Sequence, residues 1–478
     1  MTNNREIVKK QSWSALLSGK NGVHTLVFAG GSVLYAVDIY VTITALPSLI
    51  NDIGSGGYSW AMSIFTMASL IGTLLSTRIL GKIGLCKTYI FSALIFAVGA
   101  FMCSIAPTML LFLIGRFIQG FAGGSLLSLP YSMVRIVFDP SLWSRALSII
   151  SGMWGISTLL GPAIGGLSIQ YGTWRASFWT VGILAIIFLF TALKILPKDR
   201  KEICVSSPPL PLLQLFVLVL SIFIISTGSA VDTTIAKICG LVTGVGLLFV
   251  LAKIESSTHR PMLPHKTFSF SSKFLPIYSL MFIMCAIACG VELYFPLFLQ
   301  ELYKKDPLTA GYIAALLSLG WTCGSLLSAS APSKKIHKII VYSPISNLLS
   351  ISVLLWLIPT EASAPGRIFI ICLALFSTGI SFGVAWPHLL ALILQCASHQ
   401  DALRAGESLT SVQLFSTAFG AALAEKITNL ASLFSSGEGV KLIFEAKILL
   451  AVFIGLLLCV CIPFSLRISN NTLKNKTE

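Results

Sequence analysis

Long apolar runs recur along the whole sequence and restrict its fold more than any other feature. About 14 of them have roughly 18 residues or more, enough for each to cross a hydrocarbon core of about 30 Å as a helix. Backbone polar groups in lipid must be satisfied within helices or closed barrels, and these runs lack the alternation of strands. The sequence therefore predicts an all-α, polytopic membrane protein. The runs are centred near Val37, Met67, Ala97, Gly123, Gly155, Leu184, Leu218, Val242, Met284, Leu316, Ser350, Ser377, Ala418 and Phe453.

Composition supports this prediction and sets the expected orientation. Hydrophobic residues make up 55% of the 478 residues and charged residues 11%, whereas a soluble domain has about 25% charged residues. The formal net charge is +15, but most Lys and Arg residues fall on one side of the membrane when both termini are placed in the cytoplasm. We expect these basic loops to touch anionic lipid headgroups and expect no nucleic-acid partner. The predicted location is the cell membrane, the cytoplasmic membrane of a bacterium, with no cleavable signal peptide.

The predicted helices divide into six, two and six, separated by two polar, proline-containing segments. The expected divisions are a cytoplasmic segment 1–22, a six-helix bundle 23–196, linkers with two extra helices 197–273, a second six-helix bundle 274–467 and a cytoplasmic tail 468–478. The eighth and thirteenth runs contain Lys237 or the pair Glu425 and Lys426, so 12 to 14 helices are compatible with the sequence. Repeated halves with a site near the membrane midplane are typical of secondary transporters.

Asp38 is the most unusual residue of the first run, because it lies near the middle of an otherwise apolar stretch. A carboxylate at the centre of a membrane helix costs at least about 3 kcal/mol. One interpretation is that the Asp38 carboxylate is hydrogen-bonded by a neighbour on its helix or lies close enough to an interface to stay hydrated. The interpretation we favour is that it binds a proton or a cationic ligand. Tyr35 and Thr42 share its helix face, and an aromatic ring beside a carboxylate suits a lipophilic cation.

Other polar residues within the runs are candidates for the same site. Arg116 must face a cavity or a partner unless it snorkels to the outer surface, and Gln119 follows one turn later. Glu292 is either a second proton or cation site or a residue near the outer interface. Pro387 is expected to break its helix between Trp386 and His388, and these two side chains are candidates to line a substrate site.

Weaker candidates are Glu407, expected near cytoplasmic water, and Gln413. Cys285 and Cys289 share a helix face at a spacing of four residues, but no further ligand is apparent, so we expect no metal site. The 11 Cys residues are interpreted as small packing residues.

Four segments together resemble the fourteen-helix drug:proton antiporters of the major facilitator superfamily. They are Val37 to Pro47, Leu111 to Gly124, Gly161 to Gly166, and the pair Trp174 and Arg175. The resemblance implies the major facilitator fold, with two six-helix bundles and two inserted helices, and proton-coupled export without a cofactor. It also implies that Asp38, Arg116 and Glu292 take part in proton coupling. The implied antiporter motif consists of Ser157, Gly161, Pro162, Gly165 and Gly166.

Physical reasoning about the antiporter motif is independent of the resemblance. Gly161, Gly165 and Gly166 are expected to form a stripe without Cβ atoms, and Pro162 removes one backbone donor, so this helix can kink and approach a neighbour closely. Ordinary membrane-helix packing is the alternative interpretation. Ser157 stands where the family has Gly, and it is still small enough for close contact.

The basic loop after the second helix departs from the family pattern. Gly81 occupies the position of an Asp that usually helps to latch the cytoplasmic gate, and Thr77 replaces the leading Gly. The expected gating residues are Arg78, Gly81, Lys82, Gly84 and Lys87.

Taken together, these observations predict a proton-driven antiporter that exports lipophilic or cationic small molecules and acts as a monomer. A facilitator or symporter of the same fold, and a dedicated exporter of one metabolite, lipid or siderophore, are the alternatives. An enzyme is not expected, because the sequence has no nucleotide-binding loop, HExxH motif or GxSxG motif.

Overall fold

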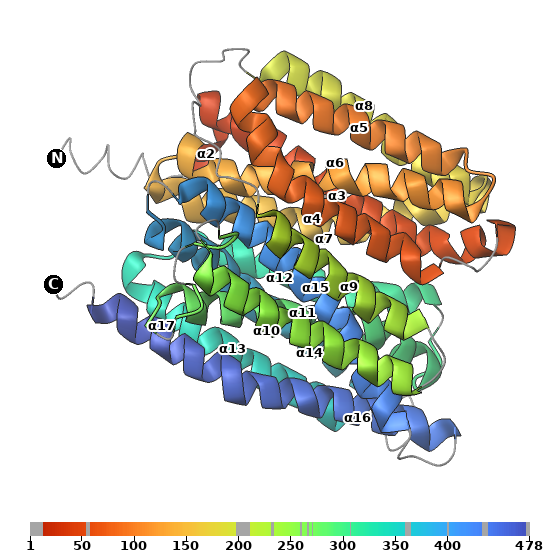
Figure 1. Ribbon diagram of the computed structural model, residues 1–478. Helices are drawn as coiled ribbons and strands as arrows, with labels where there is room; N and C mark the ends of the chain where they lie inside the picture. The colour runs from red at the N-terminus through yellow and green to blue at the C-terminus, as the bar shows by residue number, and fades with distance from the viewer. Residues whose placement is uncertain are drawn as a thin grey trace. The chain divides into compact units, whose positions relative to one another are not determined.

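The computed structural model describes residues 13–53, 58–196, 211–230, 234–258, 261–264, 267–269, 271–305, 307–358, 365–398, 401–432 and 438–474 (Figure 1). The described residues are almost entirely helical, and a long helix covers each of the fourteen predicted positions. The all-α prediction is confirmed. Residues 197–210 of the polar link and the two ends of the chain lie outside the described residues.

The chain divides into two compact units, and the first contains residues 1–226, 244–265 and 397–414. Within it α4 packs against α6, α3 against α7, and α5 against both α6 and α8; α5 and α8 run side by side in Figure 1. Its helices are α2 (Trp13–Leu17), α3 (Gly19–Ile53), α4 (Tyr58–Ile83), α5 (Leu85–Ser104), α6 (Met109–Val137), η1 (Pro140–Leu142), α7 (Trp143–Tyr171), α8 (Trp174–Ile195), most of α9 (Leu212–Ala230) and the second part of α10 (Thr234–Ser257).

The second unit contains residues 227–243, 266–396 and 415–478. Here α14 packs against both α12 and α13. Its helices are α11 (Phe274–Glu301), α12 (Pro307–Ser328), α13 (Ser333–Leu357), α14 (Pro365–Cys396), the later part of α15 (Ala402–Ser432), α16 (Glu438–Leu456), the π-helical turn η2 (Leu457–Cys461) and α17 (Ile462–Lys474). α16, η2 and α17 together form the last predicted helix.

Among the described residues, 11 helices are long and apolar enough to cross a membrane. α9, α10 and α15 do not meet both criteria, and α10 and α15 are the eighth and thirteenth helices, whose runs contain charged residues. The prediction of a polytopic membrane protein is confirmed. The count of fourteen spans stays a prediction.

Glycines bring α4 and α6 of the first unit, and α12 and α14 of the second unit, into close contact. A Cβ on Gly72 of α4 would lie 1.9 Å from the carbonyl oxygen of Phe121 in α6, and one on Gly379 of α14 would lie 1.9 Å from that of Leu317 in α12. Ser125 Oγ donates to the Gly72 carbonyl oxygen at 3.1 Å. Such contacts between small residues replace the hydrophobic driving force that helices lack within a bilayer. They give each unit a tightly packed helix pair against which the other helices are positioned.

Candidate functional site

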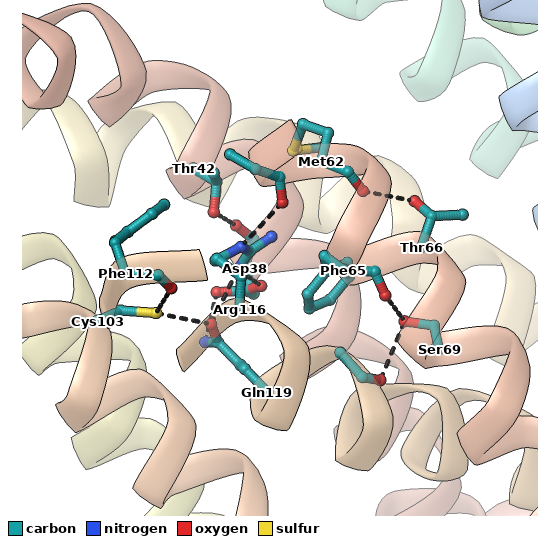
Figure 2. A network of polar contacts seen from close by, with 12 residues as sticks. Asp38, Thr42, Met62, Phe65, Thr66, Ser69, Cys103, Phe112, Arg116 and Gln119 are labelled. Atoms are coloured by element: carbon teal, nitrogen blue, oxygen red, sulfur yellow. Dashed lines mark hydrogen bonds and ion pairs between the residues drawn. The ribbon is translucent and has the colours of Figure 1, made fainter. Parts of the chain in front are cut away.

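Both carboxylate oxygens of Asp38 accept hydrogen bonds from α6 (Figure 2). Arg116 Nη1 donates to Oδ2 at 2.7 Å, and Gln119 Nε2 donates to Oδ1 at 2.7 Å. Arg116 Nη1 also donates to Gln119 Oε1 at 2.8 Å, so the three side chains form a closed ring of hydrogen bonds. Arg116 and Gln119 are three residues apart and therefore share one face of α6.

The ring is completely buried, since Asp38, Arg116 and Gln119 are each 0% exposed. Arg116 is treated as charged, because a guanidinium group is not deprotonated in proteins. Removing one partner of a buried ion pair typically costs about 3–5 kcal/mol, because the other charge is left uncompensated. Asp38 thus has a counter-ion in the bundle interior, and Arg116 does not snorkel to the surface.

Helix α4 closes the site on the side of Arg116. The guanidinium carbon lies 4.1 Å from the centre of the Phe65 ring, and Nε donates to the Ala61 carbonyl oxygen at 3.4 Å. Arg116 Nη2 has no hydrogen-bond partner among the described residues. Sequence reasoning missed Ala61 and Phe65, because nothing distinguishes them from other apolar residues of this run.

Tyr35 and Thr42 lie on the same helix as Asp38 and are also buried. Thr42 Oγ1 donates to the backbone carbonyl oxygen of Asp38 at 2.7 Å, so the proton of this hydroxyl is already hydrogen-bonded within α3. The Tyr35 ring lies 5.3 Å from the Phe65 ring and 6.0 Å from the Trp154 ring, measured between centroids. An aromatic cluster therefore adjoins the ion pair.

The antiporter motif packs on α3 directly after Asp38. A Cβ on Gly161 would lie 2.3 Å from Tyr40 Cβ, and one on Gly165 would lie 2.9 Å from Thr44 Cβ. Gly166 faces open space, with nothing within 4 Å of such an atom, so the predicted three-glycine stripe is wrong at this position. Ser157 is buried, and its Oγ donates to the Met153 carbonyl oxygen at 2.8 Å.

The predicted basic loop Arg78 to Lys87 is helical except at Gly84, because α4 continues to Ile83 and α5 begins at Leu85. Arg78 is half-buried and its Nη1 donates to the Leu74 carbonyl oxygen. Gly81, Lys82 and Lys87 are exposed. Gly84 has φ +85°, which explains the glycine at this turn because other residues rarely adopt that conformation.

The remaining predicted site residues belong to the second unit. Glu292 is partly exposed, and its Oε1 accepts a hydrogen bond from Ser318 Oγ at 2.8 Å. His388 is 2% exposed, and its Nε2 lies 3.0 Å from the Ser328 carbonyl oxygen. Trp386 is 1% exposed and packs edge-on against Trp321. α14 continues through Pro387, so the predicted break is wrong.

Glu407, by contrast, is 2% exposed, so the expectation that it lies near water is wrong. No group of three or more potential metal-ligating side chains occurs in the described part of the chain. Cys285 Sγ lies 3.9 Å from Thr417 Oγ1.

Comparison with known proteins identifies the family of this helical protein. The family model described as Major Facilitator Superfamily matches residues 28–425. The chain belongs to this superfamily. Its members are membrane transporters rather than enzymes, and the fold prediction is confirmed at this level.

Several superfamily relatives are named as drug-efflux proteins. The "Probable multidrug-efflux transporter Rv1634" of Mycobacterium tuberculosis (strain ATCC 25618 / H37Rv) is 32% identical over 433 residues, covering 88% of this chain and 90% of the relative. The "Multidrug efflux pump SdrM" of Staphylococcus aureus (strain N315) is 25% identical, covering 75% and 74%. The "Riboflavin transporter RibZ" of Clostridioides difficile (strain 630) is 22% identical and covers 78% of each chain.

Solved structures of superfamily transporters share the fold. The human organic anion transporter MFSD10 is 16% identical and aligns with a TM-score of 0.65 over 94% of this chain and 99% of that chain. The proton:xylose symporter XylE is 14% identical, with a TM-score of 0.59 over 92% of this chain and 95% of that one.

Proposed function

We propose that this transporter is a proton-coupled antiporter that exports lipophilic or cationic small molecules across the cell membrane. The names of the relatives support drug efflux, and the packing of Gly161 and Gly165 on α3 supports a role for the antiporter motif beside Asp38. The proton gradient is the energy source in this proposal, and no cofactor is required. The partners are the substrate, protons and membrane lipid, and the working unit is a monomer.

The single observation that carries the proposal is the buried pair of Asp38 and Arg116. With Asp38 ionised, the pair has no net charge. Protonation of Asp38 leaves the guanidinium uncompensated, so the site gains a full positive charge in a region of low dielectric constant. A cationic substrate near this ring is then repelled, and the proton and the substrate exclude one another without a direct contact between the substrate and Asp38.

This charge change couples to transport if the halves alternate in exposing the site to the two sides of the membrane. Asp38 takes a proton from outside, the cationic substrate leaves, and the proton is released to the cytoplasm after the site has changed sides. One proton crossing about 100 mV releases roughly 2.3 kcal/mol, and export of one monovalent cation costs the same amount, so a one-for-one exchange is driven by the pH gradient. The membrane potential contributes when the substrate is neutral or when more than one proton enters for each cation.

Dedicated transport of one metabolite is the second candidate function, supported by the relative named as a riboflavin transporter. Inhibition of transport by a panel of competing compounds distinguishes the two candidate functions. Inhibition by chemically unrelated cations supports multidrug export, whereas inhibition by one compound class alone supports a dedicated exporter.

The proposal is tested by ethidium or tetraphenylphosphonium transport in vesicles of known orientation with an imposed pH gradient. The parent is compared with Asp38→Asn and with Glu301→Gln, an acid-to-amide control at an exposed residue. We expect the Asp38→Asn variant to lose gradient-driven transport and the control to keep it. Absence of gradient-driven movement of any cation by the parent would contradict multidrug antiport, and an unimpaired Asp38→Asn variant would remove Asp38 from the mechanism.

A further inference from the structure

Helix α13 meets α14 in the second unit through a row of serine side chains. Ser350 Oγ lies 2.9 Å from Ser377 Oγ, and Ser346 Oγ lies 2.9 Å from Ser381 Oγ. Ser343 Oγ also donates to the carbonyl oxygen of Ser381. Residue numbers fall along α13 as they rise along α14 in these contacts, so the two helices are antiparallel. We refer to these five residues as the serine row.

Two completely buried polar side chains stand beside the serine row. Asn347 of α13 is 0% exposed, and neither its Oδ1 nor its Nδ2 has a hydrogen-bond partner among the described residues. Thr378 of α14 is also 0% exposed, and within the same part of the chain its Oγ1 has no partner. The hydroxyls of Ser350 and Ser381, by contrast, reach carbonyl oxygens of their own helices at 3.1 and 2.8 Å. Buried polar groups in folded proteins are nearly always hydrogen-bonded, either to protein or to ordered water.

Asn347 and Thr378 lie on the same side of the helix contact. Each directly follows a residue of the serine row, Ser346 or Ser377, and is therefore turned by about 100° around its helix. Because the helices are antiparallel, these two turns point to the same side. The register of the serine contacts places Thr378 level with Leu349, so Asn347 and Thr378 are separated by about 3 Å along the helix axis.

This side of the contact is the interior of the unit. Ser346 is exposed and Ser377 is half-buried, whereas Asn347 and Thr378 are completely buried. The serine row thus separates the two unpartnered side chains from lipid. Asn347 also lies near the middle of the apolar span Lys335–Leu357, where the bilayer supplies no hydrogen-bond partner.

The contact of α14 with α12 has a different character. A Cβ on Gly379 would lie 1.9 Å from the Leu317 carbonyl oxygen, and one on Gly383 would lie 2.1 Å from the Trp321 carbonyl oxygen. The two backbones touch along this face, which leaves no room for a ligand. A polar site on α14 is therefore restricted to the side that faces α13.

The unpartnered atoms indicate the chemistry of the ligand. The Asn347 amide offers both donors and acceptors, and the Thr378 hydroxyl offers one donor and can also accept. Water matches this set because it donates and accepts at once, and a buried water needs about two to four polar partners. A metal cation would bind the oxygens alone and leave Nδ2 of Asn347 without a partner. The residues of the serine row supply no carboxylate to balance its charge.

We propose that Asn347 and Thr378 hold ordered water inside the second unit, between α13 and α14. This water satisfies the amide and the hydroxyl and connects the two helices where their own side chains do not reach each other. α13 is thus joined by exchangeable hydrogen bonds to a helix pair, α12 and α14, that is packed backbone against backbone. The site depends on neither the substrate nor the direction of the proposed transport.

The test is X-ray hydroxyl-radical labelling of the full-length protein in lipid nanodiscs, in water that carries a heavy oxygen isotope. Radicals formed from bound water oxidise the side chains that touch it, and mass spectrometry locates the isotope. Ile351 follows Asn347 by four residues and Leu375 precedes Thr378 by three, so each shares a helix face with its neighbour. Both are 0% exposed. Phe178, which is 0% exposed within an apolar cluster of the first unit, is the reference.

We expect the parent to carry the label on Ile351 and Leu375, with Phe178 at background. Asn347→Leu should lose this label, and Thr378→Val should reduce it. Thr191→Val is the matched control, because the Thr191 hydroxyl donates to the Ile187 carbonyl oxygen of its own helix at 2.8 Å, and it should match the parent.

Background labelling of Ile351 and Leu375 in the parent, or equal labelling in the parent and in Asn347→Leu, would overturn the inference. If Asn347→Leu unfolds, Phe178 becomes labelled as well, and Thr378→Val then decides. Labelling of the parent that falls in sodium chloride but not in choline chloride would show that a cation occupies the site, which also overturns the inference. A parent that moves no cation in vesicles would contradict the proposed function and leave the labelling result unchanged.

Discussion

Arg116 and Asp38 form an ion pair between α6 and α3 in which neither side chain is exposed, with 2.7 Å between Nη1 and Oδ2. The same Nη1 atom reaches Gln119, and Nε reaches the backbone of α4. One guanidinium thus connects three helices around the carboxylate that we assign to proton binding. The planar shape of the guanidinium matters as much as its charge, because a lysine ammonium, a single charged nitrogen on a flexible chain, cannot make all these contacts at once.

Arg116→Lys is expected to reduce gradient-driven transport by at least about tenfold, since the ammonium keeps the charge but loses the planar array of donors. The protein should still fold, because the buried carboxylate keeps a positive neighbour. Transport in vesicles and thermal unfolding of the purified protein measure the two effects. Arg145→Lys, a change at a partly exposed residue of α7 whose Nη1 donates to the Ser141 carbonyl oxygen, is the matched control. Parent-like transport by Arg116→Lys would show that only the charge is needed.

Gly161→Ala and Gly166→Ala form a matched pair on one helix. The new methyl at 161 would lie 2.3 Å from Tyr40 Cβ, whereas the one at 166 meets nothing within 4 Å. Overpacking of this kind typically costs about 1–3 kcal/mol, and an unobstructed substitution changes stability by about 0.5 kcal/mol or less. We expect Gly161→Ala to lower both the unfolding temperature and transport, with Gly166→Ala close to the parent. Equal effects of the two variants would contradict close packing of α7 on α3.

His388→Leu is expected to destabilise the second unit without changing which cations are transported. The substitution removes the contact between Nε2 and the buried Ser328 carbonyl oxygen, and an unsatisfied buried acceptor costs about 1–3 kcal/mol. Thermal unfolding and a panel of substrates measure the two properties. A changed substrate profile at unchanged stability would instead place His388 in the substrate site, as the sequence alone suggested.

The helices were predictable from sequence because lipid imposes both their length and their apolar character, and a helix covers each predicted position. The ends of the helices were harder to predict. α3 begins at Gly19 rather than at Val23. α14 continues through Pro387, because groups on neighbouring helices can satisfy the backbone carbonyl that a proline leaves without a donor. The assignment of residues 397–414 to the first unit depends on contacts between helices, which no local pattern encodes.

The burial and pairing of a charged residue were predictable from sequence where that residue was anomalous for its surroundings. Asp38 and Arg116 are charges within apolar runs, and a buried charge requires a partner. Ala61 and Phe65 contact Arg116 but resemble every other apolar residue, so their part in the site follows only from the packing of α4. Glu407 was misplaced because a charged residue near a helix end is expected in water, whereas tertiary contacts bury it.

The end of α3 carries an ion pair whose pH dependence can be worked out. Asp52 lies beyond the apolar span, which ends at Ala45, and it pairs with Arg175 at the start of α8. Trp174 Nε1 donates to the same carboxylate oxygen at 3.0 Å, and Arg175 Nη2 donates to the Ala106 carbonyl oxygen at 3.1 Å. The pair therefore connects α3, α8 and the turn between α5 and α6.

Hydrogen bonds from Arg175 and then from Trp174 hold the pKa of Asp52 below its ordinary value of 3.8. A lowered pKa means that the stabilising contribution is present above the unfolded-state pKa and is lost as the pH falls through the folded-state pKa. The difference in unfolding temperature between the parent and Asp52→Asn should thus be constant from about pH 8 to about pH 5 and should shrink below about pH 4. Thermal unfolding across this range measures it. A difference that changes between about pH 8 and about pH 6 would mean that another group titrates at this contact, since Asp52 stays ionised there.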